Sequence, residues 1–416
     1  MICKPLVLFL IIFCGLHQIQ VSWQKPISIN FFVKNLDSIS LPEIKEIAKL
    51  QNATIVQYSI LPEEKTIESK LQPQESELLI WVIKPTGKIF MRRIDLKSRN
   101  NKKSSLPELI RKHQLNTKNN YIVNSNLQEL HQILIQPIAE LLPLKPEENV
   151  IFIPQGQLFN VPFAALQDED NKYLIEKHTI STSPSIQVLD LLAQRRNKNL
   201  NQRQNQQVLI VGSSIIPNQP LKPSEQLKQI PSLHSAENEA KAIIDIYNTN
   251  IKKVLHLTSL LGADATETKV VQLIPKTRII HFATQGYLED SLENSSVLAF
   301  ATTKQDDGWL TNNEVSKLKL NAELVVLSSN SSALGKITLD GVIGMPRAFL
   351  AAGADSVVGS LWNTNNLSTV TLMTEFHRNI SKNPDKAVAL RQAMLVTMKQ
   401  YPNPWDWAGF TLIGLP

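Results

Sequence analysis

Two patterns of apolar residues alternate along the second half of the chain. Short, mostly apolar runs indicate strands covered on both faces, and apolar stripes at helical spacing indicate the helices that cover them. The runs predict strands at residues 208–212, 254–257, 279–284, 324–327 and 356–362. The stripes predict helices at residues 266–274, 340–352, 367–380 and 385–400, and a helix capped by Ser235 with Ala240, Ile243, Ile244 and Tyr247 on one face. This alternation predicts a mainly parallel sheet with helices on both sides.

The first half has fewer and more separated elements. Strands are predicted at residues 52–60, 78–84 and 88–94, and the Pro85-Thr86-Gly87 turn joins the last two as a hairpin. A helix at residues 127–142, a short buried strand at 150–153 and a helix at 185–196 follow. We therefore expect an α/β fold with an N-terminal α/β extension.

A polar segment separates the two halves. Residues 194–207 contain almost no apolar side chain, which is typical of a linker. The expected organisation is a leader at 1–23, an N-terminal α/β part at 45–193, this linker at 194–207 and a core at 208–416.

The first residues read as a hydrophobic leader. Lys4 precedes an apolar run at residues 5–16 that has the length of a secretory signal and is short for a spanning helix. The residues before Ser22 make a poor cleavage site. We expect export or a membrane anchor through residues 5–16; the alternative is a hydrophobic tail on a cytoplasmic protein.

Composition excludes several classes of function. The net charge of +6 is dispersed and not interleaved with aromatic residues, which argues against nucleic-acid binding. The two cysteines, Cys3 and Cys14, both lie in the leader, so the remaining sequence offers no disulfide framework and no thiolate metal site. The histidines lack metal-ligand spacing, and no phosphate-binding glycine loop is present. We therefore expect no cofactor and no metal.

Two strand ends carry the candidate chemistry. Sites in parallel α/β sheets lie beyond the C-terminal ends of the strands. Here the strands end in Thr284-Gln285-Gly286 and in Ser328-Ser329-Asn330.

At these positions the sequence resembles the CHAT domain, a caspase-like family common in bacteria and especially in cyanobacteria. The resemblance rests on the segments IIHFATQG (279–286) and ELVVLSSNSSALGKITLDGVIGMPRAFLAAGADSVVGSLW (323–362). It extends upstream through residues 149–191 and downstream through 386–395 and 403–414, and covers most of residues 45–416. It implies a caspase-like α/β fold and, in active members, a peptidase with a His–Cys dyad at the two strand ends.

The resemblance also implies that the dyad is missing here. Gln285 stands where the family has its histidine, and Asn330 stands where it has its cysteine. A glutamine amide does not exchange protons near neutral pH, an asparagine amide does not attack peptides, and no other cysteine lies in the domain. The remaining cleft would be lined by Gly286, Ser329, Ser331 and Asp340. Ala333, Leu339 and Pro346 also depart from residues usual in the family around this site.

The resulting hypothesis is an inactive CHAT domain that binds a protein or peptide partner or regulates one. The alternative is a residual hydrolase that uses Ser329 or Ser331. His281 is the nearest histidine in the sequence, but it lies about 13 Å back along the strand, where we expect it to be buried and satisfied by backbone groups. A third reading is a decaying copy without a retained role.

Overall fold

The computed structural model describes ten segments of the chain. They are residues 39–67, 70–97, 105–118, 122–199, 207–217, 234–250, 256–289, 295–329, 332–338 and 341–416. The predicted leader lies outside them, as do Asn330, Ser331, Leu339 and Asp340. Among the described residues no helix is both long and apolar enough to cross a membrane.

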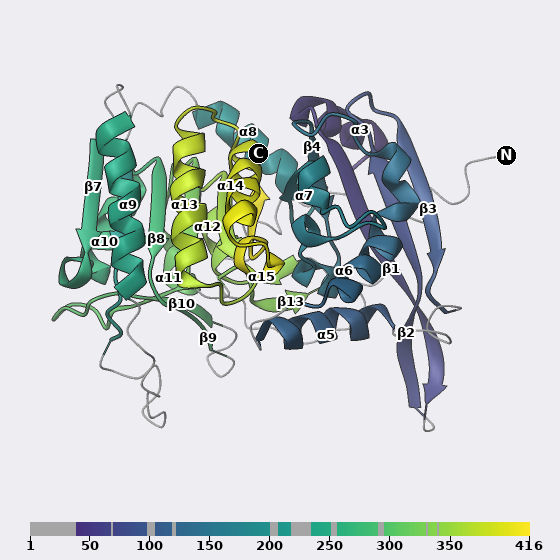
Figure 1. The fold of residues 1–416 in the computed structure, drawn as a ribbon, viewed down its shortest axis with the longest axis horizontal. Coiled ribbons are helices and arrows are strands. Elements are labelled where there is room, and N and C mark those ends of the chain that lie inside the picture. Colours follow the sequence, from purple (N-terminus) through teal and green to yellow (C-terminus); the bar gives the residue numbers. More distant parts are fainter. Residues whose placement is uncertain are drawn as a thin grey trace.

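One eleven-stranded sheet runs through both halves of the described chain (Figure 1). Its order is β3-β2-β1-β4-β5-β16-β15-β12-β8-β6-β7. The bounds are β1 Thr54–Ile67, β2 Lys70–Ile83, β3 Ile89–Asp95, β4 Asn149–Ile153, β5 Thr179–Thr182, β6 Gln207–Gly212, β7 His256–Leu261, β8 Ile279–Ala283, β12 Leu324–Ser328, β15 Ser356–Ser360 and β16 Phe410–Gly414.

The half of the sheet that carries the two strand ends is parallel. Strands β7, β6, β8, β12 and β15 are paired in parallel, and only the last strand of the chain, β16, pairs antiparallel with β15. Their side chains are buried on both faces at almost every position, because helices cover both sides. The mainly parallel, helix-covered sheet expected from the apolar runs is therefore confirmed.

Two hydrophobic cores lie on the two faces of this sheet. On one face pack α9 (His234–Asn250), α13 (Asn366–Ile380) and α14 (Lys386–Gln400), with α5 (Leu106–Lys118) and α6 (Asn124–Leu134) over the N-terminal strands. On the other face pack α3 (Leu41–Gln51), α8 (Ile186–Asn199), α10 (Glu267–Leu273), α11 (Asn312–Lys317) and α12 (Met345–Ala352). Two short helices, α7 (Leu174–Lys177) and α15 (Pro404–Trp407), complete the α-helices of the described segments.

The expected extension is an antiparallel meander. Strands β2 and β3 form the predicted hairpin through the turn at Gly87, which has a positive φ of 79°, and β1 pairs with β2 on its other side. Strand β1 also pairs in parallel with β4, so the extension continues the main sheet.

Two small sheets lie beyond the main one. Strands β9 (Gly286–Glu289), β10 (Ser295–Ala299) and β11 (Trp309–Thr311) form an antiparallel sheet directly after β8. Strands β13 (Lys336–Thr338) and β14 (Gly341–Ile343) form a two-stranded sheet between β12 and α12.

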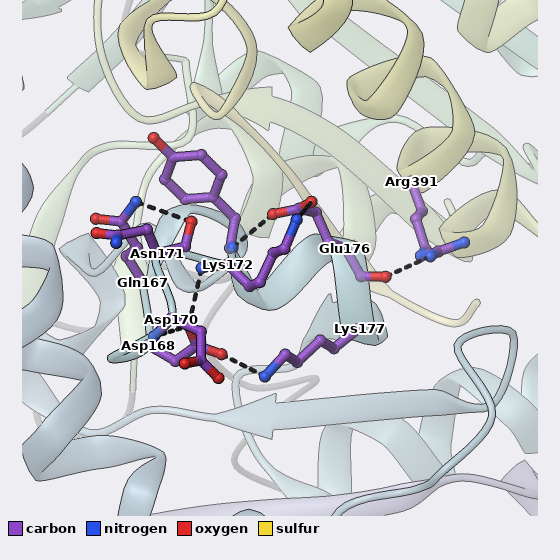
Figure 2. Close-up of polar contacts among 9 residues, drawn as sticks. Gln167, Asp168, Asp170, Asn171, Lys172, Glu176, Lys177 and Arg391 are labelled. Atoms are coloured by element: carbon purple, nitrogen blue, oxygen red, sulfur yellow. Dashed lines mark hydrogen bonds and ion pairs between the residues drawn. The ribbon is translucent and has the colours of Figure 1, made fainter.

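A polar contact fastens the first half of the chain to helix α14 (Figure 2). The Arg391 guanidinium donates to the carbonyl oxygens of Ile175 and Glu176 at 2.9 and 2.8 Å. Just before α7, the Asp168 carboxylate accepts from the backbone of Lys172 and pairs with Lys177, which closes the loop that leads into this contact.

Part of the linker predicted at 194–207 is helical in the structure. Helix α8 continues to Asn199 and β6 begins at Gln207, so only residues 200–206 lie between them, outside the described segments. The helix continues because its apolar face is already anchored at Leu189 and Leu192, and because Arg195 donates to the carbonyl oxygens of Leu350 and Ala354.

Two predicted helices differ from the structure. The helix expected at 127–142 ends at Leu134, and Gln136–Leu141 form a tighter 3₁₀ turn because Pro137 cannot continue the α-helical hydrogen bonds. The helix expected at 340–352 begins only at Met345, since the preceding Gly341–Ile343 pair as β14 and Gly344 is extended. Helix α9 is described from His234, so the predicted cap residue Ser235 lies inside the helix.

Candidate functional site

The two predicted strand ends lie side by side. Strands β8 and β12 pair in parallel with Ala283 opposite Ser328, so the chain leaves both strands at the same edge of the sheet. Thr284 and Gln285 follow the first strand, and Ser329 follows the second. The sequence thus placed these two segments correctly relative to each other.

Gln285 is held in a buried position. Its side chain is 2% exposed, and its backbone carbonyl accepts a hydrogen bond from the Ala299 amide at 2.9 Å. The neighbouring Thr284 hydroxyl donates to the Ala299 carbonyl. Gly286 begins β9, so the residue after Gln285 already belongs to the small antiparallel sheet.

The serine turn after β12 is fastened to the end of β15. The Ser360 hydroxyl donates to the Ser329 carbonyl at 2.5 Å, and the Ser332 hydroxyl donates to the Leu327 carbonyl at 2.7 Å. The Ala333 amide donates to the Ser360 carbonyl at 2.8 Å. These bonds tie the turn to the backbone of β12 and to the end of β15.

Ala333 fits this turn without backbone strain. Among the described non-glycine residues only Asn52 and Asn171 have a positive φ, so Ala333 keeps an ordinary conformation where a glycine would be usual in the family. Its methyl group faces Gly359, where an added Cβ would lie 3.2 Å from it. Pro346 lies in the first turn of α12, a position that proline tolerates well.

Ser328 and Ser329 differ from Ser332. Both are buried, and neither hydroxyl makes a hydrogen bond of ordinary geometry to another described residue. The Ser328 hydroxyl lies next to the carboxyl group of Glu239 and lowers its pKa.

A small pocket opens between these segments. Its volume is about 30 Å³, enough for one or two water-sized groups. It is lined by Ala236, Glu239, Thr284, Gln285, Ser328, Ser329, Thr364, Asn366, Thr369 and Phe410. Helix α13 begins at this rim, where Asn366 is exposed and Leu367 exposes 69% of its surface.

Behind the pocket lies a chain of four buried polar side chains. The Glu239 Oε1 atom is 2.9 Å from His281 Nε2, and His281 Nδ1 is 3.0 Å from His377 Nε2. His377 Nδ1 is in turn 3.0 Å from the Tyr247 hydroxyl. Helix α9 supplies both ends of this chain, strand β8 supplies His281, and helix α13 supplies His377.

Burial shifts the pKa values of all four groups towards their neutral forms. It raises the pKa of Glu239 to about 8 and lowers the pKa of His281 to about 3. Burial first, and His281 second, hold the pKa of His377 well below its ordinary value, and burial raises that of Tyr247. At neutral pH the chain is therefore mostly uncharged.

His281 is buried as expected. The prediction that backbone groups would satisfy its ring nitrogens was wrong. Its two ring nitrogens are occupied by Glu239 and His377. Neither nitrogen is left to take a proton from a serine in the turn. The rings of His281 and His377 meet edge to face, with their centroids 5.0 Å apart.

Glu239 was missed as a site residue. Its spacing carried a signal, because Glu239, Ile243 and Tyr247 are four residues apart and so share the apolar face that covers the sheet. No set of three or more His, Cys, Asp or Glu side chains in the described segments could hold a metal ion.

The comparisons with known proteins identify the family. Residues 124–415 match the CHAT domain. This chain belongs to the CHAT domain family. Human tetratricopeptide repeat protein 28 is 27% identical over 332 residues, which are 69% of this chain and 13% of that protein. The mouse protein of the same name is 26% identical over 339 residues, or 71% and 13%. The chain therefore spans only a small part of the curated relatives that it matches.

Solved structures are similar to this CHAT domain at low sequence identity. The separase–securin complex of Saccharomyces cerevisiae has a TM-score of 0.54 and 12% identity, covering 90% of this chain and 30% of that chain. The Arg-specific cysteine proteinase gingipain R has a TM-score of 0.46 and 10% identity, covering 71% and 68%. The caspase-like α/β fold class expected from the sequence is confirmed.

Proposed function

We propose that this CHAT domain is a pseudopeptidase that binds a protein or peptide partner at the strand ends of β8 and β12. Gln285 and Asn330 take the two places of the His–Cys dyad, and Gly286, Ser329, Ser331 and Asp340 line what is left of the cleft. The observation that carries the proposal is the pocket lined by Gln285 and Ser329 at the two strand ends. Leu367, which follows the lining residue Asn366, exposes 69% of its surface. A concave site on which several polar groups converge is the first place to expect a ligand.

The comparisons support a protein partner in general terms. The separase with the same fold is seen in a complex with securin, another protein. The curated relatives are named for tetratricopeptide repeats. Association with a membrane through residues 5–16, and export, remain part of the proposal that rests on the sequence of the leader alone.

The hydrolase alternative is not favoured by the described residues. A serine nucleophile needs a base within hydrogen-bond reach. His281 already uses both ring nitrogens, and Gln285 offers only an amide. Restoring both dyad residues with Gln285→His and Asn330→Cys should yield peptide cleavage far below that of an active CHAT peptidase assayed in parallel, because Ala333, Leu339 and Pro346 remain. Cleavage at a comparable rate would contradict this.

Binding can be tested by site-specific crosslinking. The full chain carrying a photoreactive phenylalanine analogue at Leu367 is incubated with a displayed random-peptide library, irradiated and washed under denaturing conditions. The matched control carries the same group at Leu50, which is 67% exposed on helix α3 at the far end of the molecule (Figure 1). We expect a defined sequence motif to be enriched at Leu367 and not at Leu50. Equal, motif-free recovery at both positions would refute the proposal.

A further inference from the structure

Glu239 is a buried acid whose hydrogen-bonded partner, His281, is neutral. Its side chain is 4% exposed, and it lines the pocket beside Gln285. The only group that lowers its pKa is the neutral Ser328 hydroxyl, and its other neighbour, His281, is neutral. A buried carboxyl group that faces no cation keeps its proton to a higher pH, because burial penalises the charged form.

We propose that the pocket receives a primary ammonium group, and that this group pairs with the ionised carboxylate of Glu239. This inference rests on the proposed peptide-binding function and gives the class of residue that enters the cleft. The group is the end of a lysine side chain or the free amino terminus of a peptide.

The size of the pocket selects this group. A volume of about 30 Å³ accommodates an ammonium group, which is about as large as a water molecule. The guanidinium of arginine is wider and planar, so we expect it to enter this space less readily. An ammonium group has three N–H donors, and the pocket offers acceptors in the Glu239 carboxylate and in the Ser329 hydroxyl, which makes no hydrogen bond to another described residue.

The chain of side chains behind Glu239 can support its ionised form. When the carboxylate is charged, His281 Nε2–H donates to it, His377 Nε2–H donates to His281 Nδ1, and the Tyr247 hydroxyl donates to His377 Nδ1. All three hydrogen bonds of the chain are thus made at once while His281, His377 and Tyr247 stay neutral. When Glu239 is protonated, it can donate to His281 Nε2 and the directions reverse.

The charges around the pocket are consistent with a cationic ligand. The titratable groups that face Glu239 are His281 from β8 and, beyond it, His377 from α13 and Tyr247 on α9 itself. The nearest charged pair, Arg278 with Glu323, acts on Tyr247 and is internally neutralised at 2.6 Å. The positive end of α13 lies at the rim, but the Asn365 side chain already caps the Leu367 amide there.

Binding has a defined proton balance. The neutral carboxyl group of Glu239 gives up its proton to the solvent, and the arriving ammonium group keeps all of its own. One proton is therefore released for each ammonium group bound at pH values where Glu239 is otherwise protonated, and the release fades above pH 8.

The test is calorimetry of the full chain with small probes in two buffers of different ionisation enthalpy. The probes are Nα-acetyl-lysine methylamide, the uncharged norleucine analogue, the arginine analogue, and glycinamide for a free amino terminus. At pH 6.5 we expect at least one of the two ammonium probes to bind about tenfold or more tightly than norleucine or arginine, with release of close to one proton. Whichever ammonium probe binds better identifies the source of the group.

Variants separate a specific site from a general charge effect. Glu239→Gln keeps an acceptor for His281 and should abolish both the preference for ammonium and the proton release. Ser329→Ala should weaken ammonium binding several-fold but keep the proton release. Glu237→Gln removes a carboxylate from the same helix that contacts Ser214 instead, and should change neither.

Two outcomes overturn the inference. One is equal affinity for the lysine and norleucine probes, and the other is tighter binding of acetate than of either ammonium probe. Peptides crosslinked at Leu367 without such a preference would leave the peptide-binding function standing and remove this inference alone. Ammonium binding with proton release, but with no peptide motif enriched at Leu367, would support this inference and contradict the proposed peptide-binding function.

Discussion

Replacing Glu239 with glutamine should change how the stability of the protein depends on pH. The carboxyl group is buried, and its pKa in the folded chain is about 8, compared with an ordinary 4.5. Between these values the folded chain holds a proton that the unfolded chain has released. The contribution of this group to the free energy of unfolding is therefore largest below pH 4.5 and is lost as the pH rises to 8.

The size of the effect follows from the width of that pH window. Each pH unit between the two pKa values changes the free energy of unfolding by roughly 1.4 kcal/mol, and the slope flattens near the upper value. From pH 6.5 to 8 the loss is about 1 to 2 kcal/mol. Buried histidines such as His281 have lowered pKa values, so they act in the opposite direction and only below about pH 6.5. They are the same in both proteins and cancel from the comparison.

The assay is urea unfolding of the wild type and Glu239→Gln at pH 6.5, 7.25 and 8. We expect the wild type to lose about 1 to 2 kcal/mol relative to the variant across this range. Glutamine is nearly isosteric and still accepts from His281 Nε2, so the variant should fold. Stability curves that run parallel from pH 6.5 to 8 would show that Glu239 is already ionised in the folded protein and would refute the reasoning.

Three further substitutions test other parts of the structure by chemical denaturation. Arg391→Ala leaves two buried carbonyl groups of helix α7 without their donor and should cost about 3 kcal/mol; a loss under 1 kcal/mol would contradict the contact. His113→Phe replaces a buried ring whose pKa is lowered by burial to about 4. As the pH falls from 7 to 5, the free energy of unfolding of the variant should therefore rise by about 2 kcal/mol relative to that of the wild type. A difference between the two proteins that does not change with pH would contradict this. Gly353→Ala places a Cβ 2.0 Å from the Leu320 carbonyl oxygen at a φ of 134°. Its loss in the free energy of unfolding should be several times the roughly 1 kcal/mol expected for the control Gly156→Ala, whose Cβ meets nothing within 4 Å. Equal losses for the two variants would refute the clash.

The parallel half of the fold could be predicted because its signal is local. Residues 279–284 and 324–327 are mostly apolar runs, and each is followed by small or polar residues, so their roles as buried strands follow from the sequence. The hairpin around Gly87 could be predicted for the same reason, since a Pro-Thr-Gly turn joins two apolar runs.

The missed features depend on contacts distant in sequence. Strand β14 exists because Gly341–Ile343 pair with Lys336–Thr338, and apolar spacing alone made the same residues resemble the start of a helix. The polar chain behind the pocket joins Glu239 to His281 and His281 to His377 across 42 and 96 residues. No local pattern shows which buried polar groups will meet, because the sheet order decides it.

Peptide turnover by the purified full chain tests the central claim most directly. The protein is incubated with a peptide library that varies widely at the residue before the scissile bond, and new chain ends are counted by mass spectrometry. As a pseudopeptidase it should produce no cleavage above that of buffer alone. Turnover that disappears in Ser329→Ala or Ser331→Ala would contradict the claim and establish a serine-dependent hydrolase at the same strand ends.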